Sequence, residues 1–384
     1  MYYMASRIKF RPLFVLLMAV LLAALIAGCG ESSQSAAAPS STLTIYSSGD
    51  VNVQNLWNHT LIPQFKKVHP EINLKLIFAE HGVSDQSILA RINAAVNANK
   101  DPGIDLIDSG PVEQAADAHL LAPMTAKDVP NMAHIDPSLI QQVHSFGVPY
   151  RASSVVLAYN SKTVANPPTT LKDLLAWIKA HPGKFTYNTP NSGGSGHAFV
   201  EAILNSHLSA DSQKKFVASY DPAMESQWDA GMKELKSLSP SVYRQGFYPN
   251  GNVAVLQLLA NGSIDVAPVW SDMALSYLAE HQLPDSVKLI QLDPPFSGGP
   301  AFLGIPRTTQ HLAQVYTLVN WILSADVQST IIDAINGYPG VQWSYVSQQV
   351  RDKYASIARS YGTGFSTKFG ADVNKQWQTE VAGQ

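Results

Sequence analysis

The chain has 384 residues, of which 26 are lysine or arginine and 29 are aspartate or glutamate, so its formal net charge is −3. A mildly acidic chain of this kind argues against nucleic acid as a partner. The single cysteine excludes an internal disulfide, so the hydrophobic core must hold the fold. The length is sufficient for one or two domains.

The N-terminus has the layout of an export signal. Three basic residues precede an apolar run at 13–26, and small residues lead into Cys29, which predicts a signal peptide over 1–28. The segment that ends in Cys29 resembles the bacterial lipoprotein signal, in which this cysteine becomes the lipid-bearing N-terminus. An uncleaved membrane anchor is the alternative, although the run is shorter than the roughly 20 residues that a span needs. Residues 29–41 are predicted to form a flexible tether.

Strands and helices alternate along the first part of the exported chain. Runs at 43–46, 72–78 and 104–108 are typical of strands, and helical periodicity follows each of the first two at 56–68 and 88–96. This alternation predicts an α/β fold with a sheet rich in parallel strands, and ligands gather beyond the carboxyl ends of such strands. The polar residues there are candidate contacts: Ser47, Ser48, Asp50 and Ser109. For Asp50, capping of the following helix is the alternative.

A glycine- and serine-rich loop lies near the middle of the chain. Residues 185–187 suit a short strand, residues 188–196 an open loop, and the residues from His197 onward a helix. Glycine lets the backbone approach a ligand closely, and the N–H groups of a first helical turn attract anions. The candidates for holding an anionic group are Asn188, Asn191, Ser192, Gly193, Gly194 and Ser195. The alternative is a plain helix cap by Ser192 or Ser195.

This loop lacks the common catalytic and metal-binding motifs. It has no lysine for a P-loop, and His197 stands where a nucleophile elbow needs glycine. The dinucleotide fingerprint needs a third glycine or an alanine three residues after Gly196, where this chain has Phe199. Although His197 and Glu201 are four residues apart, no second histidine stands at helical spacing. We therefore expect neither a bound metal nor a cofactor.

Further candidate contacts lie in or after two extended runs. The first contains Tyr150 and Arg151, and an arginine can hold a carboxylate or phosphate with two hydrogen bonds. The second leads to Trp270 and Asp272, which we expect on a loop at the strand's end; an aromatic face and a carboxylate together suit an amine. Pro268 predicts that the far end of this strand leaves the sheet. Core packing of Trp270 and Tyr150, and a structural ion pair of Arg151, are the alternatives.

Five segments, in a fixed order, resemble the extracellular solute-binding proteins of ABC importers. They are a Gly-x-Pro…Tyr-Asn crossing segment, a Pro-x-Thr helix, the glycine–serine loop, a Gly-x-x-Asp strand and a returning segment, at 147–160, 168–177, 188–199, 262–270 and 304–323. Leu171 departs from the pattern, because the family usually has tryptophan there. Together the segments span nearly the whole exported chain.

The resemblance implies a two-lobed fold of the type II periplasmic-binding-protein kind, with two mixed, parallel-rich sheets flanked by helices, a hinge and an interlobe cleft. Lobe one would comprise 42–149 and lobe two 150–299, and 300–384 would return to lobe one and add C-terminal helices. The iron-binding branch of the family uses neighbouring tyrosines, whereas the Tyr-Tyr pair of this chain, Tyr2 and Tyr3, lies in the signal peptide.

The implied function is capture of a small polar or charged solute by an exported, lipid-anchored monomer that delivers it to an ABC permease. An anionic end at the glycine–serine loop and a cationic or aromatic end at Trp270 and Asp272 would suit a phosphonate, a thiamine-like compound or a polyamine. A sensing lipoprotein of the same fold is one alternative. Another is an exported hydrolase with Ser195 or Ser192 as nucleophile and His197 as base, for which no acid partner is evident.

Overall fold

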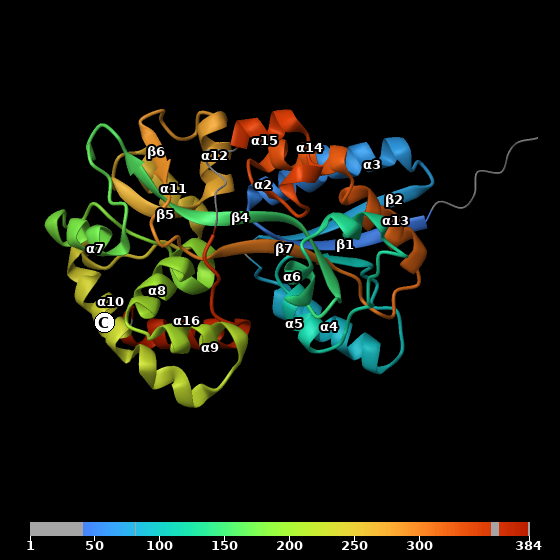
Figure 1. Ribbon diagram of the computed structural model, residues 1–384, viewed down its shortest axis with the longest axis horizontal. Helices are drawn as coiled ribbons and strands as arrows, with labels where there is room; N and C mark the ends of the chain where they lie inside the picture. Colours follow the sequence, from blue (N-terminus) through green and yellow to red (C-terminus); the bar gives the residue numbers. More distant parts are fainter. Residues whose placement is uncertain (1–40, 81, 355–360, 383–384) are drawn as a thin grey trace, which may run out of the picture. The chain divides into compact units, whose positions relative to one another are not determined.

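The computed structural model describes residues 41–80, 82–354 and 361–382 (Figure 1). The predicted signal peptide, Cys29 and all but the last residue of the tether lie outside these ranges. The strands are β1 (Ser41–Gly49), β2 (Ile72–Glu80), β3 (Leu106–Asp108), β4 (Gly147–Asn160), β5 (Val266–Trp270), β6 (Val287–Ile290), β7 (Gly298–Gly304) and β8 (Tyr338–Pro339). Among the described residues no helix is both long and apolar enough to cross a membrane.

The helices predicted at 56–68 and 88–96 are present. A π-helical stretch, Leu56–Leu61, joins the first two into one run, and Pro63 lies at the start of the second, where a missing N–H is tolerated. The α-helices are α2 (Val51–Asn55), α3 (Ile62–Val68), α4 (Asp85–Asn97), α5 (Val112–Asp117), α6 (Pro137–Gln141), α7 (Leu171–Ala180), α8 (Gly194–Ser206), α9 (Ala210–Ala218), α10 (Asp229–Leu238), α11 (Asn252–Ala260), α12 (Ser271–Ala279), α13 (Leu312–Ile322), α14 (Ala325–Ile335), α15 (Gln348–Tyr354) and α16 (Thr367–Glu380).

The strands form one mixed sheet in the order β2-β1-β3-β7-β4-β5, and β6 and β8 also pair with β4. β1 is parallel to β2 and to β3, as the alternation of strands and helices predicted. The ladders that involve β4 or β7 are antiparallel. The predicted α/β fold with mixed, helix-flanked strands is therefore confirmed, with its parallel pairs at the β2-β1-β3 end.

β4 and β7 connect the two ends of this sheet (Figure 1). β4 pairs with β7 over 147–154 and with β5 and β6 over 155–160, while β7 also pairs with β3. A register shift between Pro149 and Arg151 interrupts the β4–β7 ladder. Because β4 takes part at both ends, the strands join into one sheet and do not form two separate ones.

Both faces of the sheet are buried, since neighbouring residues of a strand enter different hydrophobic cores. In β1, Ile45 belongs to one core and Tyr46 to another. In β4, Leu157 belongs to a third core and Ala158 to a fourth. Burial on both faces explains why these strands are continuous apolar runs. We call the residues of the first two cores (43–150 and 302–350) the first half, and those of the other two (155–296 and 365–381) the second half.

The C-terminal segment contributes to both halves. Trp343 packs against the first half, whereas Phe369 and Trp377 of α16 are fully buried in the second half. Gly362 forms a bridge with Ser297 just before β7 begins. The chain after β7 thus contributes first to the core of the first half and then to the core of the second half.

Two predictions near the glycine–serine loop are wrong. Residues 185–187 form no strand, because Phe185 makes only isolated bridges with Val242 and Val266. The following helix begins at Gly194, not at His197, and its N-cap residue Gly193 offers no side chain. Glycine has low helix propensity, so the glycine-rich sequence at 194–196 did not indicate a helical turn. Tertiary packing holds this turn in place.

Two predictions about the second extended run are also wrong. β5 stays paired with β4 as far as Val155↔Trp270, although Pro268 lies within it. β5 is the last strand in the sheet order, where the N–H that proline lacks is not needed by a further strand. Asp272 lies in the first turn of α12, directly after the strand, and not on a loop.

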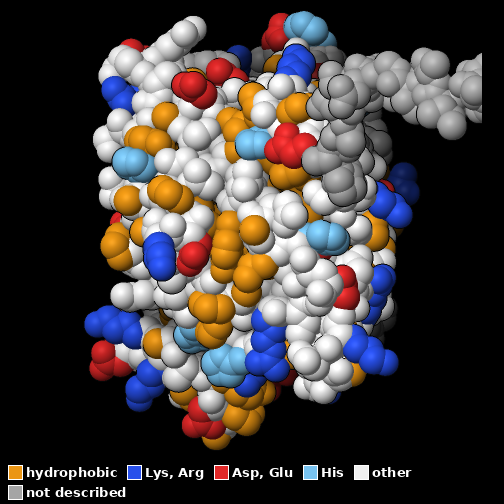
Figure 2. All heavy atoms as spheres, turned by 90° about the vertical axis from the view of Figure 1, so that its right-hand side faces the viewer, with side chains coloured by type: hydrophobic (Ala, Val, Ile, Leu, Met, Phe, Trp, Pro, Cys, Tyr) orange, Lys and Arg blue, Asp and Glu red, His pale blue; other side chains and the backbone are white. Residues whose placement is uncertain are grey.

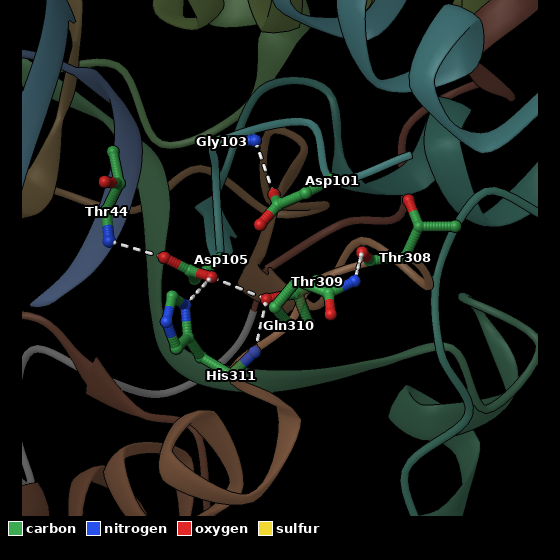
Figure 3. A network of polar contacts seen from close by, with 8 residues as sticks. All are labelled: Thr44, Asp101, Gly103, Asp105, Thr308, Thr309, Gln310 and His311. Carbon is green, nitrogen blue, oxygen red and sulfur yellow. Dashed lines mark hydrogen bonds and ion pairs between the residues drawn. The ribbon is translucent and has the colours of Figure 1, made fainter. Parts of the chain in front are cut away.

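A buried carboxylate fixes the segment that follows β7 (Figure 3). Asp105, only 3% exposed, accepts hydrogen bonds from the backbone N–H of Thr44 at 2.8 Å and from the Thr309 hydroxyl at 2.5 Å. Nδ1 of His311 lies 2.9 Å from the same carboxylate. These contacts attach the returning chain to the start of β1, far along the sequence from it.

The face of the first half seen in Figure 2 carries mixed charges. Lysine and arginine side chains are scattered over this face and alternate with acidic and apolar ones.

Candidate ligand-binding site

A cavity of about 550 Å³ opens between the first and the second half. The wall includes the end of β1, the residues directly after β3, and parts of β4, β5 and β7. The first turns of α2, α4, α5, α8, α11 and α12 also contribute to it. A volume of this size is typical of small-molecule sites. The chain folds this way because residues at strand ends and helix starts from distant parts of the sequence meet beside the crossing strands.

Asp85 stands on the first-half side of the cavity, in the first turn of α4. Its carboxylate accepts hydrogen bonds from the hydroxyls of Tyr46, at 2.6 Å, and Ser48, at 3.4 Å. Burial raises the pKa of Asp85, and burial together with the neighbouring Asp85 raises that of Tyr46. Gly110 approaches so closely that an added Cβ would lie 2.1 Å from the Asp85 carboxylate. This part of the wall therefore has room only for glycine at 110.

Asp108 and Arg151 are joined through two hydroxyl groups. Tyr150 accepts from Nε of Arg151 and donates to Asp108, both at 2.8 Å. Ser109 accepts from Nη2 of Arg151 at 2.9 Å and donates to Asp108 at 2.7 Å. Asp108 also accepts from Ser47 at 2.6 Å and from the Trp57 indole at 2.8 Å. Burial raises the pKa of Tyr150, which keeps its hydroxyl protonated and able to donate.

The N-terminal turn of α8 forms part of the second-half side. An added Cβ on Gly194 would lie 2.5 Å from the Trp270 ring, and one on Gly193 would lie 2.5 Å from Oδ1 of Asn252. The amide oxygen of Asn188 accepts the backbone N–H of Gly196 at 2.8 Å. Asn188, rather than Ser192 or Ser195, thus supplies the side-chain hydrogen bond to this helix start.

Asp272 and two asparagines connect the sides of the cavity. Asp272 accepts from the Asn52 amide at 3.0 Å and from the Ser153 hydroxyl at 2.5 Å, and Asn252 donates to Asp50 at 2.8 Å. Burial raises the pKa of Asp272, which is 4% exposed. Since Asn52 and Asp50 belong to the first half's α2 region and Asp272 and Asn252 to the second half, the two halves touch directly across the cavity.

The structure separates the sequence-predicted residues into two groups. Those on the cavity wall are Ser48, Asp50, Ser109, Arg151, Gly193, Gly194, Trp270 and Asp272. The others do not line it: Ser47, Tyr150, Asn188 and Ser195 are buried behind the wall, and Asn191 and Ser192 lie beside it. The buried ones support lining residues, as when Ser195 lies 2.8 Å from the amide oxygens of both Asn188 and Asn252.

Sequence reasoning missed several polar residues of the wall, chiefly Asn52, Asp85, Glu113, Ser153 and Asn252. Four of them stand in the first turn of a helix that begins after a strand or turn, and an Asn-Gly turn signal directly precedes α11. A systematic inspection of helix starts would have found these. Ser153, inside the apolar run of β4, carried no signal.

Among the described residues, no group of three or more histidine, cysteine, aspartate or glutamate side chains is arranged to hold a metal ion. His197 instead lies 3.1 Å from the buried Glu201, which also accepts the backbone N–H of Phe365 at 2.8 Å. This pair ties α8 to the C-terminal segment.

The family model of the bacterial extracellular solute-binding proteins matches residues 61–355. The chain therefore belongs to this family, as the order of its motifs predicted. It is 25% identical over 287 residues to protein YnjB of Escherichia coli strain K12, a match that covers 72% of this chain and 73% of that protein.

Two solved structures have the same fold. An ABC transporter substrate-binding protein from Bradyrhizobium japonicum superimposes with a TM-score of 0.65 at 19% identity, covering 89% of this chain and 99% of that one. The spermidine/putrescine substrate-binding protein PotD of Streptococcus pneumoniae gives 0.64 at 16% identity, with 89% and 100% covered. The chain is thus an extracellular solute-binding protein and not an enzyme, which removes the hydrolase alternative.

Proposed function

We propose that this protein captures a small polar or charged solute in the cavity between its halves and delivers it to an ABC permease. One observation carries the proposal: the wall of the cavity is drawn from both halves, which β4 and β7 connect. A solute there would touch both sides at once. Contacts that exist only when the halves are together shift the population toward the closed form.

The two halves are the proposed lobes, with boundaries close to those expected from sequence: 42–149, 150–299 and a return from 300. The division of the hydrophobic cores supports these limits. α16 is assigned to the second lobe, because Trp377 is buried in the core of the second half.

The proposed ligand contacts are the predicted residues that line the cavity, together with Asn52, Ser153 and Asn252. Candidate ligands are phosphonates, thiamine-like compounds and polyamines. The acid-free first turns of α8 and α11 favour an anionic end, and Trp270 beside Asp272 favours a cationic one.

We further propose that the protein is exported as a monomer and held at the outer face of the cytoplasmic membrane by a lipid on Cys29. The basic, apolar and small residues before Cys29 support this, and the tether would let the domain reach a permease. Radiolabelled palmitate incorporation that disappears in Cys29→Ser would establish the anchor.

A thermal-shift screen of the full chain tests solute capture. Phosphonates, thiamine forms, polyamines, sulfonates and sugars are added, and a solute at about 100 times its Kd should raise the Tm by roughly 2–4 °C. Trp270→Ala should remove the shift, whereas Trp177→Ala, a tryptophan that stacks on His181 away from the cavity, should keep it. A shift that survives Trp270→Ala would place the solute elsewhere.

A sensing lipoprotein of the same fold remains the second candidate. It would present its closed form to a membrane receptor and release no solute. Reconstitution with a permease and its ATPase separates the two functions, because only a transport protein stimulates solute-dependent ATP hydrolysis.

A further inference from the structure

The charge of the cavity wall narrows the class of solute. Arg151 is the one arginine or lysine on the described wall, and it shares both Tyr150 and Ser109 with Asp108. Two hydroxyls that each accept from the guanidinium and donate to the carboxylate make a closed, hydrogen-bonded ion pair. The positive charge of Arg151 is therefore balanced inside the protein, and it does not set the charge of the cavity.

Besides Asp50, three carboxylates line the cavity: Asp85, Glu113 and Asp272. Their hydrogen-bond donors are neutral, namely tyrosine, serine, threonine and asparagine side chains. In the described part of the chain none of the three lies within ion-pair distance of a lysine, arginine or histidine. Arg151 also favours the ionised form of Asp272, but it forms no ion pair with any of the three, so the wall carries net negative charge.

Helix starts work against this charge, but they do not cancel it. Asp85, Glu113 and Asp272 each stand in the first turn of a helix, where the aligned peptide dipoles amount to roughly half a positive charge. A full carboxylate outweighs half a charge, so these three helix starts are net negative. The starts of α8 and α11 have no acidic residue in the first turn and keep their positive sign.

Asn52 adds an observation that is independent of charge. Its amide nitrogen donates to Asp272 at 3.0 Å, which fixes the orientation of the side chain. The amide oxygen is then buried without a partner, in a residue that is 9% exposed and stands on the cavity wall. A buried acceptor without a donor is costly, and an N–H group of a ligand would satisfy it.

We propose that the solute is a protonated amine whose N–H groups donate to Asn52 and Asp272, with Asp85 and Glu113 on the same cavity wall and the ring of Trp270 beside it. This rests on the proposed function of solute capture. A cation beside an aromatic face gains further attraction. An anion held by Arg151 would compete with the ion pair to Asp108, so Arg151 does not favour an anion without an amine.

Calorimetry of the full chain with three groups of probes tests the proposal. The amines are putrescine, agmatine and spermidine, choline is the cation without N–H on nitrogen, and phosphate, methylphosphonate and glucose are the controls. At least one amine should bind, and choline should bind at least about tenfold more weakly, because it cannot donate to Asn52. Asp272→Asn should weaken the amine at least about tenfold, whereas Asp211→Asn, on the exposed start of α9, should leave the affinity unchanged.

Variants keep the test decisive if Asp272→Asn fails to fold. Asp85→Asn should weaken binding of the amine as well, and Asn52→Ala should weaken binding of the amine more than binding of choline. Phosphate, methylphosphonate or glucose binding that Trp270→Ala abolishes would overturn the amine assignment and leave solute capture intact. Binding of none of the probes, together with no hit in the wider thermal-shift screen, would overturn both.

Discussion

The first half holds its side of the cavity by side-chain hydrogen bonds, whereas the second half holds its side largely by close backbone packing. Asp108 alone accepts four hydrogen bonds, from Ser47, Trp57, Ser109 and Tyr150. In the second half, Gly194 and Gly196 leave no room for a side chain against Trp270 and Asn188. The first side therefore fixes the positions of several charged groups, and the second, apart from Asp272, fixes the shape that a solute meets.

This difference predicts that the two sides fail differently when they are mutated. Loss of a buried acceptor on the first side leaves several donors and a cation without a partner. An added methyl group on the second side displaces an aromatic ring or a backbone segment instead. The four predictions below test this contrast, from the largest expected effect to the smallest.

Asp108→Ala should lower the free energy of unfolding by about 3–5 kcal/mol, because it leaves Arg151 buried without its carboxylate. Urea denaturation followed by fluorescence measures the change. Asp128→Ala provides the control, since this exposed carboxylate accepts a hydrogen bond from the neighbouring Thr125 at the surface. A loss below about 1 kcal/mol would show that the network on the first side is not needed for stability.

Gly196→Ala should cost about 1–3 kcal/mol, because the new methyl group would lie 1.9 Å from the backbone oxygen of Asn188. Gly299→Ala is the matched control on the wall of the same cavity, where an added Cβ meets nothing within 4 Å. Thermal unfolding of both variants gives the comparison. Equal stabilities would mean that the start of α8 can move away without loss.

The pH dependence of stability should test the contrast between the two sides at Asp272. Burial raises its pKa from the ordinary 3.8; Asp50 acts in the same direction, whereas Ser153, Arg151 and Asn52 oppose the shift. The folded chain therefore holds a proton that the unfolded chain has lost, so this group's contribution to stability is present below 3.8 and disappears as the pH rises through the raised pKa.

Amine binding should show the opposite trend, because it needs the ionised carboxylate. The affinity for the amine should rise by at most about tenfold per pH unit as Asp272 loses its proton. Asp272→Asn should reduce the pH dependence of both the affinity and the free energy of unfolding. Calorimetry and urea denaturation over a pH series measure them. Unchanged slopes in the variant would assign the titration to another group.

Tyr46→Phe should have the smallest effect, about 1 kcal/mol, since it removes one hydrogen bond of 2.6 Å to Asp85. The same variant should also weaken amine binding less than Asp85→Asn does, because the carboxylate remains. Tyr316→Phe, which loses a bond of 3.0 Å to a backbone oxygen far from the cavity, is the control for the loss of a tyrosine hydroxyl. If Tyr46→Phe matched Asp85→Asn in binding, the hydroxyl and not the charge would contact the solute.

The sequence by itself determined the order and type of most elements. Apolar runs and helical periodicity are local properties, so β1, β2, β4 and α4 lie where they were predicted. The family followed from the order of the motifs, and eight of the proposed contacts, including Trp270 and Asp272, do line the cavity. These residues could be predicted because ligands in α/β folds bind at strand ends and at glycine-rich helix starts.

Only the tertiary structure decided what each polar residue does. Arg151 was expected to face an anion, but its charge is balanced by Asp108 through two hydroxyl groups. One belongs to Tyr150, the preceding residue, and the other to Ser109, 42 positions away. Asn188, expected to bind solute, holds the start of α8. A side chain's charge and hydrogen-bonding groups can be read from its identity, but whether they are already satisfied depends on partners that folding brings from far along the chain.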